Sequence, residues 1–312
     1  MSEGTPAPMH AVPRWRVWWL GARPRTLGAG SIPVVVGTAA SGDVVWWRLA
    51  AAGLVAAGLQ IGVNFANDAF DGLKGVDTHE RLGPPRLTQS GAASPRAVLI
   101  AAFIAFGVAG LAGLALALAT APVLILAVGA LAIAAALLYS GGPRPYAGLG
   151  LGEVMVFVFF GVVATCGTSF VMVETIPAAS WWCAAALGSL AVAILEANNI
   201  RDVATDAAAG KHTLAVRIGE ARARRLYAGL IVVPFVAIAA GVLVYLAWPA
   251  AGLTQWGLFG LAAWPLAIRP LEASRTATGG ALIPVLIGTA KLHAATGLLL
   301  ALGLVLAQTV ST

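Results

Sequence analysis

The chain has 312 residues, of which 59% are hydrophobic and only 10% are charged, and its mean hydropathy is +0.88. These values exclude a water-soluble globular domain and are typical of polytopic membrane proteins. The net charge is +6, and the two cysteines and four histidines show no metal-ligand spacing. We therefore expect neither a disulfide framework nor a zinc site, and no nucleic-acid partner.

The N-terminal residues 1–13 are polar, rich in proline and without an apolar core, so they are predicted to be disordered. The run RWRVWW follows, from position 14 to 19. Tryptophan and arginine together are typical of the lipid headgroup layer, which favours a short interfacial helix, although an ordinary juxtamembrane anchor explains the run equally well. We assign residues 14–312 to a single transmembrane domain.

Nine apolar segments have the length and composition of membrane-spanning helices. The predicted fold is therefore an all-α polytopic bundle, and the abundance of Gly and Ala favours close helix packing. The predicted spans are 25–42, 49–68, 97–119, 122–140, 151–173, 180–200, 223–248, 251–269 and 281–308.

The basic residues support this count. With nine spans, every Lys and Arg except Arg48 and Lys291 falls on one side of the membrane. The positive-inside rule then places the N-terminus, and two acidic segments described next, in the cytoplasm of a multi-pass protein of the cell membrane.

Two acidic segments follow the second and the sixth predicted span, NFANDAFDGLKGVD and NNIRDVATDAAAGKHTLAVR. Within each segment, one of the Asn residues and two of the Asp residues are spaced by about one helical turn, so each such set shares one face of a helix. The two sets are Asn64, Asp68 and Asp71, and Asn198, Asp202 and Asp206.

Clustered carboxylates repel one another unless a cation lies between them, and hard oxygen ligands suit Mg²⁺. A single Asp-x-x-Asp at a helix end is usually a solvated terminus. Two such sets on one predicted side, each running into a basic loop, instead favour a site for Mg²⁺ and a diphosphate. Four basic residues are expected to take the remaining phosphate charge, namely Lys74, Arg144, Arg201 and Lys211.

The segments 67–77 and 198–219 resemble the two Asp-rich signatures of the UbiA superfamily of intramembrane aromatic prenyltransferases. RPRTL (23–27) and YSGGPRPYAGLGLGE (139–153) support this resemblance, which extends from about residue 14 to the last span. Within the superfamily the chain is most similar to the branch that acts on 1,4-dihydroxy-2-naphthoate in the menaquinone pathway. One departure is Gly75, where many members carry a further Asp; the next acid here is Asp77.

The resemblance implies nine transmembrane helices around a central cavity, capped by two cytoplasmic loops. It also implies that a polyprenyl group passes from polyprenyl diphosphate to 1,4-dihydroxy-2-naphthoate, with loss of CO2 and diphosphate, to give demethylmenaquinone. Asp68, Asp71, Asp202 and Asp206 would bind Mg²⁺; Lys74, Arg144, Arg201 and Lys211 would bind diphosphate; Asn64, Asn67, Asn198 and Tyr139 would orient the substrates.

Two alternatives stay open. One is a related prenyltransferase with another acceptor, such as hydroxybenzoate, homogentisate, haem or a phosphoribosyl compound. The other is a transporter with intramembrane acids, but transporter sites tend to lie near the membrane midplane, whereas these acids lie at the predicted cytoplasmic ends of helices.

Overall fold

The computed structural model describes residues 13–74 and 86–311, and the regular structure in this part of the chain is all helical, with no strand. The predicted disordered segment lies almost entirely outside the described residues. The helices are α1 (Arg14–Gly21), α2 (Pro24–Ser41), α3 (Trp46–Lys74), α4 (Pro95–Ala119), α5 (Pro122–Ser140), η2 (Tyr146–Leu149), α6 (Gly152–Val156), η3 (Phe157–Val163), α7 (Ala164–Val173), α8 (Ala178–Arg201), α9 (Val203–Ala208), α10 (Leu214–Ile218), α11 (Glu220–Ala247), η4 (Pro249–Ala251), η5 (Gln255–Ala263), α12 (Pro265–Ser274), η6 (Gly279–Leu282) and α13 (Ile283–Ser311).

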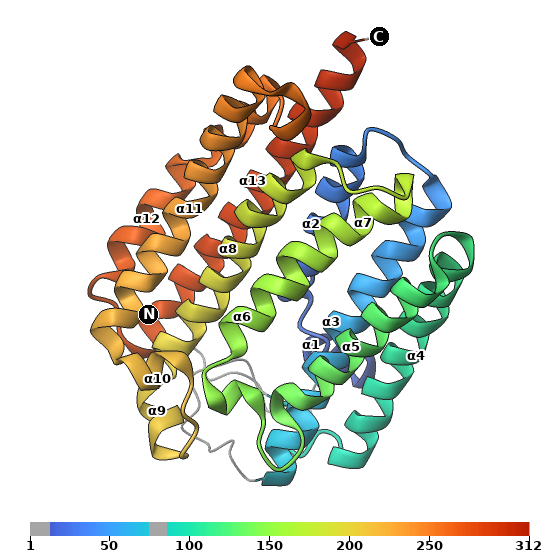
Figure 1. Ribbon diagram of the computed structural model, residues 1–312. Helices are drawn as coiled ribbons and strands as arrows, with labels where there is room; N and C mark the ends of the chain where they lie inside the picture. Colours follow the sequence, from blue (N-terminus) through green and yellow to red (C-terminus); the bar gives the residue numbers. More distant parts are fainter. Residues whose placement is uncertain (1–12, 75–85, 312) are drawn as a thin grey trace.

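The long helices run side by side along one bundle axis (Figure 1). Helices α3, α4 and α5 pack together on one side, and α8, α11, α12 and α13 on the other, while α2 contacts both sets. Helices α3 and α8 end at the same end of the bundle, where the loop between α5 and α6 also lies (Figure 1). The two acidic segments, 134 residues apart from Asn64 to Asn198, therefore share one end of the molecule.

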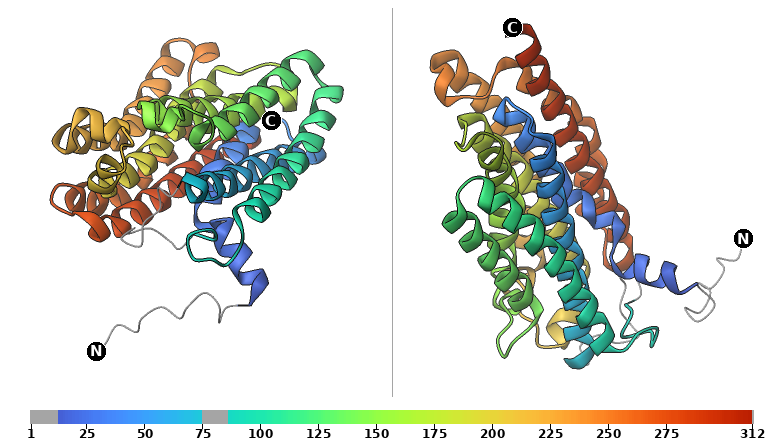
Figure 2. Two further views of the ribbon diagram at one scale, coloured as in Figure 1. Left: turned by 90° about the horizontal axis from the view of Figure 1, so that it is seen from below. Right: turned by 90° about the vertical axis from the view of Figure 1, so that its right-hand side faces the viewer.

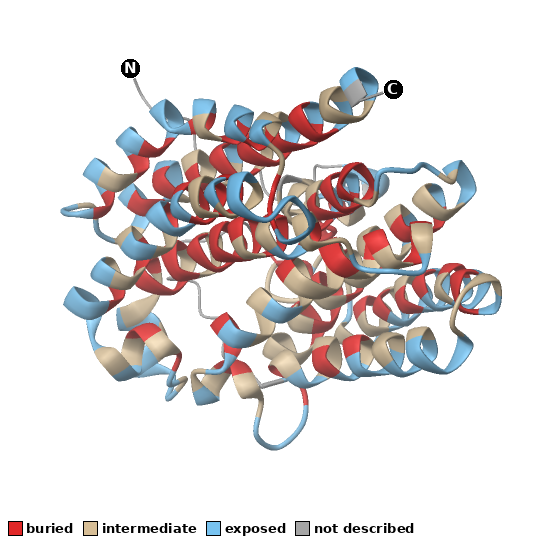
Figure 3. Ribbon diagram, turned by 45° about the horizontal axis from the view of Figure 1, so that its top comes forward, coloured by how far each residue is buried: buried red, intermediate tan, exposed pale blue. Residues whose placement is uncertain are grey.

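Seven helices among the described residues are long and apolar enough to cross a membrane, and they correspond to seven of the nine predicted spans. A shorter apolar helix, Thr26–Ser41, corresponds to the first predicted span. Their outward faces carry large apolar side chains that no other part of the protein covers, as the exposed positions in Figure 3 show. Leu111, Val123 and Leu131 are examples, with 72%, 85% and 64% of their surface exposed.

Two of the predicted spans are not regular α-helices. The span 151–173 contains the π-helical segment η3, and 251–269 consists of the 3₁₀ segment η5 followed by α12. In the second case the prediction of one continuous α-helix was wrong. Pro265 has no N–H to donate to the preceding turn, and Gly260 packs so closely that a Cβ there would lie 2.9 Å from Leu300 Cγ.

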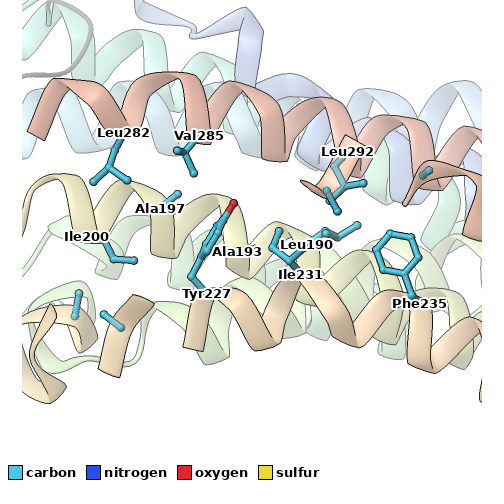
Figure 4. Packing of buried hydrophobic residues seen from close by; sticks show 14 residues of the cluster. Leu190, Ala193, Ala197, Ile200, Tyr227, Ile231, Phe235, Leu282, Val285 and Leu292 are labelled. Atoms are coloured by element: carbon cyan, nitrogen blue, oxygen red, sulfur yellow. The ribbon is translucent and has the colours of Figure 1, made fainter. Parts of the chain in front are cut away.

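Small residues let the helices approach one another closely, as the composition predicted. A Cβ on Gly161 of η3 would lie 2.7 Å from the Cα of Gly188 on α8, so the two backbones touch at this crossing. Larger residues fill the space between α8, α11 and α13 (Figure 4). The one polar tip labelled there, the hydroxyl of Tyr227, lies 2.7 Å from Thr289 Oγ1, which satisfies both groups.

A short helix, α1, lies where the interfacial helix is predicted, and it projects from the side of the bundle (Figure 2). Trp18 packs edge-on against Phe65 of α3, with ring centroids 5.8 Å apart, whereas Trp15 is 70% exposed. Arg23 then adopts a left-handed conformation, with φ at 54°, which turns the chain from α1 into α2.

At the end of the bundle opposite the acidic segments, Arg48 joins three helices. Its guanidinium donates hydrogen bonds to the carbonyl oxygens of Val171 (2.9 Å), Met172 (3.2 Å) and Ala119 (3.2 Å). These carbonyls belong to the C-terminal turns of α4 and α7. Carbonyl groups in the last turn of a helix have no N–H donor within their own helix. Arg48 also lies 3.6 Å from Glu174, an exposed carboxylate.

Replacing Arg48 should therefore loosen this end of the bundle. Arg48→Met keeps the apolar stem but leaves the helix-end carbonyls without donors, and we expect a loss of about 1–3 kcal/mol in stability, measured as a lower melting temperature in detergent. Glu174→Gln is the matched control, because an exposed ion pair contributes at most about 1 kcal/mol. Equal melting temperatures for the two variants would contradict this role of Arg48.

Candidate active site

Three segments come together at the end of the bundle that carries the acidic residues. The end of α3 meets the loop between α5 and α6, since a Cβ on Gly141 would lie 2.7 Å from Phe70 Cε2. The same loop meets the segment after α9, where Arg217 Nη2 donates to Gly148 O at 3.5 Å and Gly150 packs against the Arg217 side chain. The two loops thus form one continuous surface between α3 and α8.

Tyr139, at the end of α5, lies between the two acidic segments. The charges of Asp71 and Asp206 both act on its hydroxyl, as do those of Glu153 and Arg23. Its ring packs edge-on against Tyr146, with centroids 5.4 Å apart. Burial raises the pKa of Tyr146, so that phenol stays protonated. One side chain therefore lies within electrostatic reach of Asp residues from both segments, which brings the two segments to a common site.

In the first segment, Asp71 pairs with Arg86. The Arg86 Nη1 atom donates to Asp71 Oδ2 at 2.7 Å and to the carbonyl oxygen of Asn67 at 2.8 Å, and Arg86 is only 6% exposed. The amide oxygen Oδ1 of Asn67 is buried and has no hydrogen-bond partner among the described residues. A free acceptor beside a paired carboxylate leaves room for a further cation or donor.

In the second segment, α8 ends at Arg201 and the chain turns at Asp202 before α9 begins, so the Asp residues do not share one uninterrupted helix. Arg201 forms a two-pronged pair with Asp202, with Nε–Oδ1 at 2.7 Å and Nη2–Oδ2 at 2.6 Å. Asp206 lies 3.5 Å from Lys211 Nζ. Each of these carboxylates has its own cation, as Asp71 does.

Asp68 and Asn64 have different surroundings from the other predicted site residues. Asp68 is 2% exposed; its Oδ2 accepts from Leu87 N (2.8 Å), and its Oδ1 accepts from Thr88 N (3.1 Å) and Thr88 Oγ1 (2.5 Å). The Asn64 amide donates to Ala22 O at 2.9 Å. Both side chains fasten α3 to neighbouring segments, and Asp68 has no oxygen left without a partner.

The remaining predicted residues are distributed around the same end. Arg144 is exposed on the loop between α5 and α6, and Asn198 is partly buried near the end of α8. Lys74 is the last residue of α3, and Asp77 lies outside the described residues.

Sequence reasoning gave no role to three residues that the structure brings forward. Arg86 was counted only as a positive-inside charge, but it follows the first acidic segment in a run rich in Gly and Pro, a context that could have marked it. Glu153 and Glu196 lie in apolar spans, and Glu153 is contacted by Asn199 Nδ2 at 2.7 Å. An acid within a membrane span is a signal of function that the two Asp segments overshadowed.

The chain is similar to known proteins both in amino-acid sequence and in three-dimensional structure. The profile of the UbiA prenyltransferase family matches residues 30–279. A relative from Mycobacterium tuberculosis, named 1,4-dihydroxy-2-naphthoate octaprenyltransferase, is 49% identical over 276 residues, which cover 87% of this chain and 91% of the relative.

Two solved structures share the fold. A UbiA homologue from Aeropyrum pernix K1, in its apo form, aligns with a TM-score of 0.67 at 16% identity and covers 90% of this chain and 97% of its own. A UbiA homologue from Archaeoglobus fulgidus, bound to DMAPP and Mg²⁺, aligns with a TM-score of 0.58 at 15% identity, covering 91% and 98%.

The contacts of Asp68 predict a loss of stability on its removal. Asp68→Ala leaves the N–H groups of Leu87 and Thr88 without acceptors, each costing about 1–3 kcal/mol, so the melting temperature in detergent should fall clearly. Thr88→Val, which removes one of the three donors, should give a smaller decrease. An Asp68→Ala protein that melts like the wild type would show that these hydrogen bonds do not support the fold.

Proposed function

Because this chain belongs to the UbiA prenyltransferase family, we propose that its two acidic segments hold the diphosphate of a prenyl donor between them. The protein is an enzyme of menaquinone biosynthesis, which transfers a polyprenyl group from polyprenyl diphosphate to 1,4-dihydroxy-2-naphthoate. The identity of 49% over most of the chain to a dihydroxynaphthoate prenyltransferase supports this reaction. Within the structure, the observation that carries the site is that the loop between α5 and α6 contacts both the end of α3, at Phe70, and the segment after α9, at Arg217.

The reaction that we propose replaces one bond by another. The C–O bond between the prenyl C1 and the diphosphate breaks, and its electron pair leaves with the diphosphate. The ring carbon that bears the carboxylate bonds to C1, and CO2 departs to restore the aromatic ring. The product is the quinol form of demethylmenaquinone.

The donor groups at this site fit magnesium. Asp71, Asp202 and Asp206 offer hard oxygen atoms, and Asn67 adds a buried amide oxygen that lacks a partner among the described residues. Those residues contain no group of three His, Cys, Asp or Glu side chains that could hold a metal ion alone. This agrees with Mg²⁺, which uses one or two carboxylates together with phosphate oxygens. When bound, Mg²⁺ supplies positive charge to the diphosphate leaving group.

The ion pairs at the site suggest how a charged ligand is accepted. Arg86, Arg201 and Lys211 neutralise Asp71, Asp202 and Asp206, so no carboxylate among these three stands alone. A diphosphate that arrives with metal cations brings charges of both signs. We propose that the carboxylates then turn to the cations, and that the basic side chains turn to the phosphate oxygens, with Arg144, Lys74 and Arg23 adding charge nearby.

The roles of the other predicted residues follow from their contacts. We propose that Tyr139 lines the reaction site and orients the substrates, and that Asn67 and Asn198 provide amide groups to the ligands. We propose that Asp68, which accepts hydrogen bonds from the turn at residues 86–90, binds Mg²⁺ together with Asp71, and that Asn64, which holds α3 against the segment between α1 and α2, orients the substrates.

We also propose nine membrane crossings. Helix α2 and the combined η5–α12 segment would add two crossings to the seven long helices. Under the positive-inside rule, the end with the Asp segments faces the cytoplasm of the cell membrane, with its loops covering a central cavity. Residues 14–312 would then form one domain within the lipid bilayer.

A prenyltransferase with a related aromatic acceptor remains the second candidate function, because the residues that bind the diphosphate of the prenyl donor do not select the acceptor. Incubation of the purified protein with polyprenyl diphosphate, Mg²⁺ and dihydroxynaphthoate should yield a product whose mass reflects loss of CO2. A product that retains the carboxylate, or turnover only with hydroxybenzoate or homogentisate, would overturn the assignment.

Removal of a proposed ligand should stop catalysis without unfolding the protein. For Asp71→Asn and Asp202→Asn we expect kcat/KM to fall by about 100-fold or more, because each variant removes a preorganised charge that acts in the transition state. EDTA should abolish turnover, and added Mg²⁺ should restore it. Glu174→Gln, at the opposite end of the bundle, should keep wild-type kinetics, and full activity in a metal-free assay would refute the role of Mg²⁺.

A further inference from the structure

A second group of acids lies inside the bundle, next to the Asp segments but not part of them. Glu196 of α8 is completely buried, and neither of its carboxylate oxygens has a hydrogen-bond partner among the described residues. A buried polar group without a partner costs free energy, and a buried charge without one costs much more. Apart from the neighbouring carboxyl group of Glu153, no described side chain offsets that cost, so the Glu196 carboxyl group can still accept a ligand.

Glu196 lies beside another carboxyl group, that of Glu153 on α6, and the two act on each other electrostatically. Glu153 is also buried and accepts one hydrogen bond, from Asn199 Nδ2 at 2.7 Å. Two adjacent carboxyl groups in apolar surroundings repel each other when both are charged. The pair therefore places several hydrogen-bonding oxygen atoms together in an apolar setting.

The helix crossing described above holds the two acids together. Gly161 and Gly188 touch where η3 and α8 cross. Glu153 precedes Gly161 by as many positions as Glu196 follows Gly188, and the two helices run in opposite directions, so both acids lie about 12 Å from the crossing along their helices. The close approach of the two glycines thus sets the register that pairs the acids.

The acid pair lies next to the site that we assign to the diphosphate. A Cβ on Gly152 would lie 3.8 Å from Tyr139 Cε2, and the charge of Glu153 acts on the Tyr139 hydroxyl. Along α8, Glu196 precedes Arg201 by five residues, or about 7.5 Å. The pair therefore adjoins the charged end of the bundle, close to Tyr139.

From this arrangement we propose that Glu153 and Glu196 bind the hydroxyl groups of the aromatic acceptor. The proposal rests on the acceptor class assigned above and extends it to named residues. A hydroquinone ring presents O–H donors that match an unpartnered carboxylate, and such a hydrogen bond to a charged acceptor is short and strong. It also increases electron density on the ring whose carbon attacks the prenyl group. A diphosphate, in contrast, would be repelled by the pair.

The test is equilibrium binding of dihydroxynaphthoate to the purified full-length protein, by calorimetry without oxygen, polyprenyl diphosphate or Mg²⁺. Glu196→Gln, which keeps the shape but removes the charge, should weaken binding of dihydroxynaphthoate about tenfold or more, which corresponds to about 1.4 kcal/mol. Binding of 2-naphthoate, which lacks both hydroxyl groups, should be weak and the same in wild type and variant. Glu153→Gln should behave in the same way.

Controls separate this inference from a general loss of structure. Polyprenyl diphosphate with Mg²⁺ should bind Glu196→Gln within about twofold of wild type, and Glu174→Gln should bind both substrates normally. An unchanged affinity of Glu196→Gln for dihydroxynaphthoate, or an equal loss for 2-naphthoate, overturns the proposal.

A measurement on the wild type alone keeps the test decisive if the variants do not fold. The dimethyl ether of dihydroxynaphthoate has no hydroxyl group that could donate a hydrogen bond. If it binds as tightly as the parent compound, Glu153 and Glu196 do not bind the hydroxyl groups of the acceptor. If the wild-type protein forms product and the Glu196→Gln variant binds dihydroxynaphthoate with unchanged affinity, only this inference is refuted. Wild-type protein that neither binds dihydroxynaphthoate nor forms product refutes the proposed function itself.

Discussion

The central physical constraint on this protein is the cost of placing charge next to hydrocarbon. Charged residues make up only 10% of the chain, and the helices that carry the two acidic segments, α3 and α8, end at the same end of the bundle. There the carboxylates of Asp71, Asp202 and Asp206 each lie against an Arg or Lys side chain. Such pairs limit the free energy lost on burial while keeping strong charges at hand. A ligand that combines metal cations with phosphate anions can replace both partners of each pair at once.

The arrangement of long helices could be predicted from sequence because it depends on the length and apolarity of the spans. Most span boundaries agree with the observed helices within a few residues; the segment 122–140, for example, is reproduced by α5. The failures occur where local backbone chemistry prevails. Pro265 and its neighbouring glycines divide one predicted helix, and the π-helical turn at Phe157–Val163 gives no periodic signal, since its residues are apolar on all sides.

The sequence predicted which residues gather at the candidate site, but it did not predict the contacts that each of them makes. The spacing of Asn64, Asp68 and Asp71 predicted that they share one face of a helix, and all three lie on α3. The spacing did not predict that both carboxylate oxygens of Asp68 accept hydrogen bonds from the turn at residues 86–90. Spacing cannot reveal this, because the partners come from a loop whose path is set by tertiary contacts. The same limit hid Arg86, whose role depends on reaching back to Asp71.

The two polar groups in the bundle differ in a way that matches the two halves of the reaction. The charged end holds acids with their counter-ions, an arrangement suited to a highly charged, exchangeable ligand. The pair of Glu153 and Glu196 has no counter-ion among the described residues and a single amide contact, from Asn199. That arrangement suits a neutral donor such as a ring hydroxyl, whose desolvation costs less than that of an ion. Tyr139 lies within reach of both groups, so the bond-forming atoms of donor and acceptor are expected to meet beside it.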